Sequence, residues 1–153
     1  MTSKTALEVR PLMASDRDDW AALWTAYLEF YKASVPAPIY DLYFGRLLGS
    51  DPQDFSGLVA VLDGNLVGLT HFLYHRHGWK DENVCYLQDL YADPAVRGLG
   101  IGRALIEGVY DAADANGTPS VYWLTQEENT QARKLYDRIA QESGFVKYGR
   151  VIT

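Results

Sequence analysis

Three glycines alternate at the point where a predicted strand gives way to a predicted helix: Gly98, Gly100 and Gly102. The apolar run over 84–91 predicts a strand covered on both faces, and helical spacing over 101–116 predicts the helix. Glycines at such a junction let backbone N–H groups converge on an anion, and the helix N-terminus adds partial positive charge. The segment also carries Arg97 and Arg103 and no acidic residue, although the chain has a net charge of −6. It therefore predicts a pyrophosphate site.

Two familiar phosphate-binding loops do not fit this segment. A Walker loop ends in Gly-Lys-Ser/Thr, whereas this one ends in Gly102-Arg103-Ala104. A Rossmann loop that started at Gly98 would need a third glycine where Arg103 stands, and it would follow the first strand of the domain. A tight strand-to-helix join with no ligand is the remaining alternative.

Hydrophobic periodicity predicts a mixed α/β chain that forms one domain over residues 1–153. The expected strands and helices follow the order β-α-α-β-β-β-α-β-α-β, at 6–10, 16–32, 39–48, 57–62, 66–74, 84–91, 101–116, 121–125, 129–140 and 145–152. The turn Asp63-Gly64-Asn65 joins two of the strands as a hairpin. The sheet should therefore begin as an antiparallel meander and end with a parallel crossover.

Two stretches resemble one family. Arg97–Gly102 matches the Arg/Gln-x-x-Gly-x-Gly/Ala signature of the GNAT superfamily of N-acetyltransferases, and Asn129–Tyr136 is similar to its Asn-x-x-Ala-x-x-Leu-Tyr motif. The resemblance implies a GNAT-like mixed sheet whose central strands splay apart to hold acetyl-CoA as co-substrate, with no metal. Its polyamine, amino-acid and histone-tail branch looks most similar.

The resemblance also implies where acetyl-CoA binds. The pyrophosphate would rest on the backbone amides of Arg97, Gly98, Leu99, Gly100, Ile101, Gly102 and Arg103. The pantetheine arm would pair with the end of the preceding strand, at Leu90, Tyr91 and Ala92. Asn129 would begin the helix beside the pantetheine, and an ordinary N-cap is its alternative role.

Three residues are candidates for catalysis. Tyr136 matches the motif tyrosine, and its phenol can protonate the departing thiolate; a place in the apolar stripe of its helix is the alternative. Gln88 stands where related polyamine-type enzymes carry Glu, and an amide is no useful base. Asp89 should point to the opposite face of the strand, so it serves as a base only if a bulge turns it inward; a structural role is the alternative.

The stripe Trp20, Trp24, Tyr27 and Tyr31 is typical of a core-facing helix. Its C-terminal end and the loop 32–40 are candidates for an aromatic substrate wall, as in similar enzymes, with Glu29 and Asp41 there to attract a cation. Exposed acids that only solvate are the alternative.

Composition narrows the class of protein. The acidic balance argues against nucleic acid or an anionic membrane and favours a cationic partner. A single Cys85 cannot form an internal disulfide, and we expect a cytoplasmic protein. His71, His75 and His77 share one strand face, but the first two would lie about 13 Å apart, too far to share a metal without a bend.

These features predict an N-acetyltransferase that transfers an acetyl group to a primary amine by direct attack. The acceptor would be a small cationic amine, an amino acid or a lysine-like side chain; the alternative is a non-catalytic sensor of acyl-CoA. Only about eight residues, 145–152, are available for a strand after the last helix, so this single terminal strand would leave an open edge. We expect a two-fold homodimer in which Tyr148 and Val151 help to bury the interface. The alternative is a monomer whose open edge is protected from pairing by the charges of Lys147 and Arg150.

Overall fold

The computed structural model describes residues 6–96 and 98–152. Its elements are β1 (Leu7–Pro11), η1 (Ala14–Asp16), α1 (Arg17–Phe30), α2 (Ala37–Leu48), β2 (Ser56–Leu62), β3 (Asn65–His75), β4 (Val84–Ala92), α3 (Ile101–Ala115), β5 (Val121–Tyr122) and α4 (Thr130–Ile139). The chain divides into two compact units, with the boundary between Trp123 and Leu124. A single domain over 1–153 stays a prediction.

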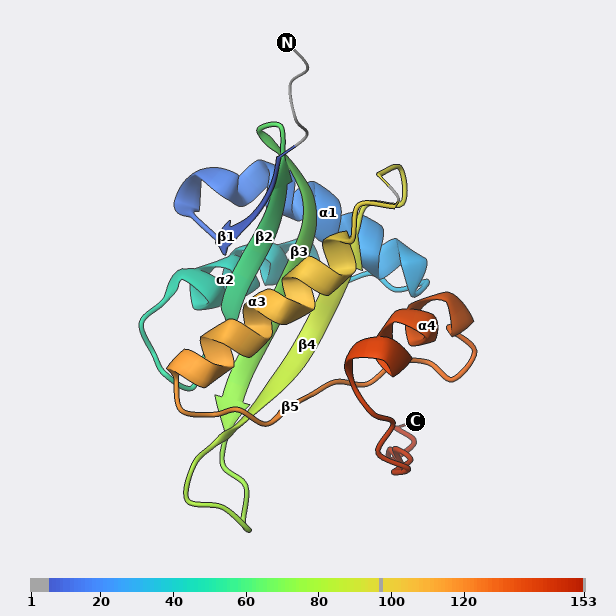
Figure 1. Cartoon of the computed structure of the whole chain (residues 1–153). Coiled ribbons are helices and arrows are strands. Elements are labelled where there is room, and N and C mark those ends of the chain that lie inside the picture. The colour runs from blue at the N-terminus through green and yellow to red at the C-terminus, as the bar shows by residue number, and fades with distance from the viewer. Residues whose placement is uncertain (1–5, 97, 153) are drawn as a thin grey trace. The chain divides into compact units, whose positions relative to one another are not determined.

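The first unit contains one five-stranded sheet in the order β1-β2-β3-β4-β5 (Figure 1). Neighbouring strands are antiparallel except β4 and β5, which are parallel. Leu62 pairs with Asn65, and the two residues between them, Asp63 and Gly64, have φ of 50° and 85°. Both angles suit a tight hairpin turn, so the hairpin predicted from Asp63 and Gly64 is confirmed.

Helices cover both faces of the sheet in the first unit: α3 lies over one face, and α1 and α2 lie over the other (Figure 1). Alternation along the strands divides their side chains between two clusters. Val59 and Leu69 pack with Trp20 and other side chains of α1 and α2. Ala60 and Val67 pack with α3. Every strand from β2 to β4 is thus buried on both faces.

Gly68 on β3 lets α3 approach the sheet. A Cβ added there would lie 2.9 Å from Ile101 Cγ2 and 3.0 Å from the Tyr91 carbonyl oxygen. The same close approach positions the start of α3 beside the end of β4, where the Asp93 N–H donates to the Val67 carbonyl at 2.8 Å.

We expect Gly68→Ala to lower the free energy of unfolding by about 1–3 kcal/mol, because the added methyl overpacks against a β-branched side chain and a backbone oxygen. Gly45 on α2 is the matched control, since nothing lies within 4 Å of a Cβ there. Gly45→Ala should be neutral or raise stability by up to about 1 kcal/mol. Urea unfolding measures both; equal effects of the two substitutions would contradict this account of Gly68.

Two expected strands differ from the structure. The strand predicted over 121–125 is paired only at Val121 and Tyr122. The strand predicted over 145–152 is wrong: the described residues after α4 form neither helix nor strand. A strand forms only where its backbone can hydrogen-bond to a neighbouring strand, and β5 has only two paired residues. Gly149 also weakens a strand over this segment. No helix among the described residues combines the length and apolar character needed to cross a membrane.

Candidate active site

A bulge in β4 shapes the centre of the first unit. His71 pairs with Asp89 and the next residue, Phe72, pairs with Leu87, so Gln88 is an extra residue on β4. A bulge changes the side-chain direction that strict alternation would give. Gln88 and Asp89 consequently line the same cavity. The expectation that only one of them could face a cleft is wrong, and the bulge considered for Asp89 is present.

The parallel ladder between β4 and β5 is short. It joins Cys85 to Val121 and Tyr86 to Tyr122, while β4 continues to Ala92. Along that continuation β4 still pairs with β3, through the three candidate pantetheine residues Leu90, Tyr91 and Ala92. On the β5 side of β4, Leu90, Tyr91 and Ala92 have no strand partner among the described residues. The backbone there is an open edge, and the two strands part as predicted.

The glycine segment forms a turn into α3. Gly98 and Gly100 have φ of 78° and 68°, and Gly100 is the N-cap of the helix. A Cβ at either glycine would have nothing within 4 Å, and the first turn of α3 has no acidic residue. The N–H groups of Ile101, Gly102 and Arg103 begin the helix and have no acceptor within it, so the segment fits an anion such as a pyrophosphate.

The side chains of this segment contribute less to an anion site than its backbone N–H groups do. Arg103 Nε donates to Glu107 Oε1 at 2.7 Å, which turns that guanidinium along the helix. Leu99 is exposed. Arg97 lies outside the described residues.

Asp89 is a buried carboxylate that pairs with no Lys or Arg side chain among the described residues. Its Oδ2 accepts hydrogen bonds from Tyr43 Oη at 2.6 Å and from His71 Nδ1 at 2.7 Å. Its backbone carbonyl accepts from Thr70 Oγ1 at 2.8 Å. Burial raises the pKa of Asp89, but the hydrogen bond and the charge of His71, together with hydrogen bonds from Tyr43 and Tyr27, outweigh it, and the pKa lies below the ordinary value.

Trp20 fixes the tautomer of His71. The indole Nε1–H of Trp20 can only donate, and it lies 2.9 Å from His71 Nε2. That nitrogen is therefore the acceptor in this contact, and Nδ1 carries the proton that bonds to Asp89. Both Trp20 and His71 are fully buried. A chain of hydrogen bonds from α1 through β3 thus holds the Asp89 carboxylate in place.

Tyrosines surround this carboxylate. Burial first, and then the charge of Asp89, raises the pKa of Tyr27, Tyr31, Tyr43 and Tyr86. Their hydroxyls therefore stay protonated and donate. Their ring faces carry partial negative charge, which adds to the attraction of a carboxylate for a cation.

These groups open into a cavity of about 510 Å³ in the first unit. Its walls are one face of α1, one face of α2, the loop before α2, Phe55 and the β4 bulge; the residues are Trp24, Tyr27, Leu28, Tyr31, Val35, Ile39, Leu42, Tyr43, Arg46, Phe55, Gln88 and Asp89. The candidate aromatic wall is thus part of this cavity. Glu29 and Asp41 do not line it, and Asp41 instead pairs with Arg17 at 2.7 Å.

The second unit carries the other two candidates. Asn129 stands at the N-cap of α4 without a side-chain capping bond, so its ordinary capping role is absent. Its Nδ2 instead donates weakly to Thr125 Oγ1 at 3.4 Å. Tyr136 lies within α4, at helical spacing from Ala132 and Ile139.

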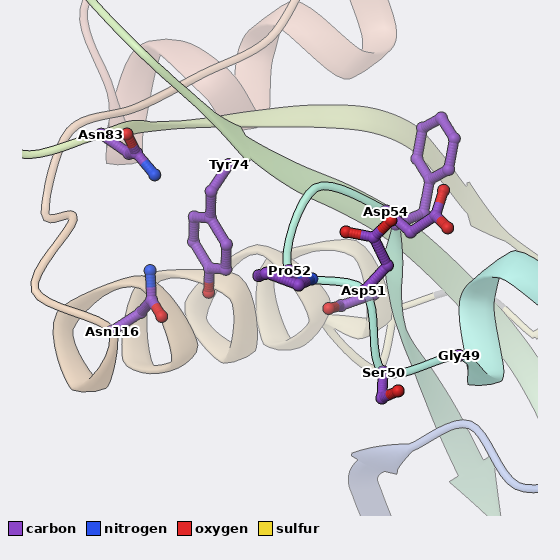
Figure 2. Close-up of a pocket in the computed structure, with 10 residues that line it drawn as sticks. Gly49, Ser50, Asp51, Pro52, Asp54, Tyr74, Asn83 and Asn116 are labelled. Atoms are coloured by element: carbon purple, nitrogen blue, oxygen red, sulfur yellow. The ribbon is translucent and has the colours of Figure 1, made fainter.

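A second cavity of about 280 Å³ in the first unit is lined by the loop between α2 and β2 and by residues of β3 and the end of α3 (Figure 2). Asp51, Asn83 and Asn116 make its lining polar. Tyr74 points toward α3, where its hydroxyl donates to the Ala112 carbonyl at 3.3 Å. None of the candidate site residues lines this cavity.

The three histidines have separate partners. His75 hydrogen-bonds to Tyr122 at 2.7 Å, and His77 accepts from the Trp79 N–H at 3.1 Å, while His71 holds Asp89. Within residues 6–96 and 98–152, no group of three His, Cys, Asp or Glu side chains is arranged to hold a metal.

Sequence reasoning did not identify His71, Tyr43 or Arg46 as site residues. His71 was considered as a metal ligand, with a substrate-cleft or surface histidine as the alternative, but its place opposite Asp89 in the β3–β4 pairing was not predicted. The loop between these strands does not fix their register, so that pairing had no signal in the sequence. Tyr43 and Arg46 lie three residues apart on α2, on the face that lines the cavity.

Comparison with known proteins agrees with this geometry. The sequence profile described as "Acetyltransferase (GNAT) family" matches residues 20–140. The D-amino-acid N-acetyltransferase HPA3 of Saccharomyces cerevisiae is 35% identical over 143 residues, which cover 93% of this chain and 89% of that protein.

Two solved structures share the fold. The ribosomal-protein-alanine N-acetyltransferase from Brucella melitensis biovar Abortus 2308 aligns with a TM-score of 0.76 and 25% identity, over 96% of this chain and all of that one (100%). AAC(6')-Iy in complex with the bisubstrate analogue CoA-S-monomethyl-acetylneamine aligns with a TM-score of 0.83 and 18% identity, over 97% and 99% of the two chains. The chain therefore belongs to the GNAT family of acetyltransferases and is an acyltransferase.

Proposed function

We propose that this chain is an N-acetyltransferase that transfers an acetyl group from acetyl-CoA to the primary amine of a small acceptor that binds through an ammonium group. The observation that carries the proposal is the buried Asp89 carboxylate, which has three protein donors but no Lys or Arg partner among the described residues. A buried charge of this kind is stabilised further by a cationic ligand. It lies at the β4 bulge, within three residues of the open edge of β4.

The donor side uses the backbone. When bound, acetyl-CoA supplies the acetyl group as an activated thioester. The open edge at Leu90, Tyr91 and Ala92 offers backbone hydrogen bonds to an extended pantetheine arm, and the N–H groups that begin α3 receive the pyrophosphate. The CoA-bound neighbour supports this assignment at the level of the fold alone.

The acceptor side uses Asp89 and Gln88. Asp89 binds and orients the ammonium group, while Gln88 can hydrogen-bond to it but cannot take its proton. The lowered pKa of Asp89 makes this carboxylate a weak proton acceptor as well, so the proton leaves the amine through water. Tyr136 and Asn129 keep the roles that the family motif implies: thiolate protonation and contact with the pantetheine.

The pH dependence follows from these assignments. A lowered pKa keeps Asp89 ionised from about pH 5 to 9, so kcat/KM should rise with pH as the amine deprotonates, without an inflection from Asp89. The stability that the Asp89 carboxylate contributes is lost only as pH falls from the ordinary value of 3.8 through the lower folded value. A kcat/KM profile with an inflection near pH 6–7 that disappears in Asp89→Asn would contradict this assignment.

We also propose a homodimer in the cytoplasm. The segment after α4 carries exposed apolar side chains at Phe145, Val146, Tyr148, Val151 and Ile152, and it lacks a strand partner among the described residues. Pairing with a second copy would bury these side chains. Light scattering should give twice the chain mass of 17.2 kDa at micromolar concentration. A single-chain mass that persists on concentrating the sample would rule the dimer out.

An amine panel tests the proposed reaction. The full chain is mixed with acetyl-CoA and a set of primary amines, and thiol release is measured together with the acetylated product. We expect release that depends on the amine. Tight binding of acetyl-CoA with no turnover on any amine would instead support a non-catalytic sensor.

A further inference from the structure

The cavity lined by Asp89 holds two opposite charges. Among its lining residues, Asp89 is the one acid and Arg46 is the one base; the others are apolar, aromatic or neutral. A linear polyamine has cationic groups at both ends, so its second cation would find no acid here. A ligand with an ammonium and a carboxylate matches the pair of charges.

Arg46 is available to bind an anion. It lies in the last turn of α2, on the cavity face with Ile39, Leu42 and Tyr43. Its guanidinium has no hydrogen-bond or ion-pair partner among the described residues. In the first unit Arg10 and Arg17, by contrast, are held by Asp16 and Asp41 at 2.8 and 2.7 Å.

The geometry of α2 relates the two charges. Tyr43 donates to Asp89, and Arg46 follows three residues later on the same face, about 4.5 Å further along the helix axis. An arginine side chain is long and flexible enough to bring its fork to a carboxylate near that position. The amine and the carboxylate of one small molecule can therefore engage both residues.

We infer that Arg46 binds the carboxylate of the acceptor, and that the acceptor is an α-amino acid with an apolar side chain. This inference rests on the proposed function and narrows its substrate class. Asp89 holds the α-ammonium group, and the apolar walls from Leu28, Val35 and Leu42 take the side chain. Arg46 is thus a specificity-determining residue of the acceptor site.

The test compares matched acceptors with and without a carboxylate: leucine with isoamylamine, and phenylalanine with phenethylamine, each amino acid as both enantiomers. Arg46→Gln should lower kcat/KM for the preferred amino acid by about 10- to 100-fold, because it removes charge-assisted hydrogen bonds. The same substitution should leave kcat/KM for the amines within about twofold. Arg46→Lys should recover part of the loss, since it keeps the charge without the fork.

Lys80→Gln is the matched control, because it removes the same charge from an exposed residue outside the cavity. It should change neither acceptor. Wild-type preference for the amines, or an equal loss on amines and amino acids in Arg46→Gln, would overturn the carboxylate assignment but keep the acetyltransferase reaction.

A binding measurement separates failure of the inference from failure of the proposed function. Tryptophan fluorescence of the full chain is titrated with leucine and with isoamylamine, because Trp24 lines the cavity. Leucine should bind more tightly, and Arg46→Gln should abolish the difference. If nothing is acetylated but this difference holds, the proposed reaction fails and the carboxylate site stands; equal binding of both ligands overturns it.

Discussion

Replacing Asp89 with asparagine is expected to lower kcat/KM for the acceptor amine by about 10²- to 10³-fold. The substitution keeps the shape and the oxygen that accepts from His71 and Tyr43, but it removes the charge that holds the ammonium group. Binding of acetyl-CoA should survive, because the glycine segment and the β4 edge are untouched. Most of the loss should appear in KM, since Asp89 binds the acceptor and is a weak base. Steady-state kinetics with both substrates varied measures it.

Asp81→Asn is the control for this prediction. Asp81 is an exposed loop residue outside the cavity, so its substitution changes the net charge equally and should leave kcat/KM unchanged. Urea unfolding should leave Asp81→Asn at wild-type stability and should lower that of Asp89→Asn, because its hydrogen bonds from His71 and Tyr43 lose the carboxylate charge. A fully active Asp89→Asn variant would show that the carboxylate has only a structural role.

Replacing Tyr136 with phenylalanine should slow the chemical step on the order of 10²-fold. The family motif assigns this hydroxyl to the departing thiolate, and its removal leaves the apolar stripe of α4 intact. Stability and acetyl-CoA affinity should barely change. Single-turnover kinetics isolates the chemical step from product release.

Tyr74→Phe is a matched control, since it removes a hydroxyl that bonds to the Ala112 carbonyl beside the second cavity. Its single-turnover rate should equal that of the wild type. A Tyr136→Phe variant with the same rate would return Tyr136 to the apolar stripe.

Local signals in the sequence predicted most of the fold. The Asp-Gly turn, the apolar stripe of α1 and the alternating glycines each depend on a few neighbouring residues, and the structure has the hairpin, the helix and the turn into α3 at those positions. The strand expected over 145–152 failed because a strand depends on a partner as well as on its own residues.

The acceptor site depended on contacts that cross the chain. Asp89 could be identified as a candidate, but its position in the cavity depends on the Gln88 bulge, which arises from pairing with β3. Its donors come from α2 and β3, far away in sequence. Arg46 belongs to no sequence motif. It was not a candidate because its place in the acceptor cavity depends on which face of α2 lines that cavity.

The most direct test of the acceptor site is a crystal structure of the full chain with CoA and an acceptor amine. The two ligands cannot react, because free CoA carries no acetyl group. The account predicts that the amine nitrogen lies within hydrogen-bond distance, about 3 Å, of the Asp89 carboxylate. The CoA thiol should lie beside the open edge of β4 at Leu90–Ala92, within reach of that nitrogen. An amine bound elsewhere, with the cavity around Asp89 empty while CoA is in place, would contradict it.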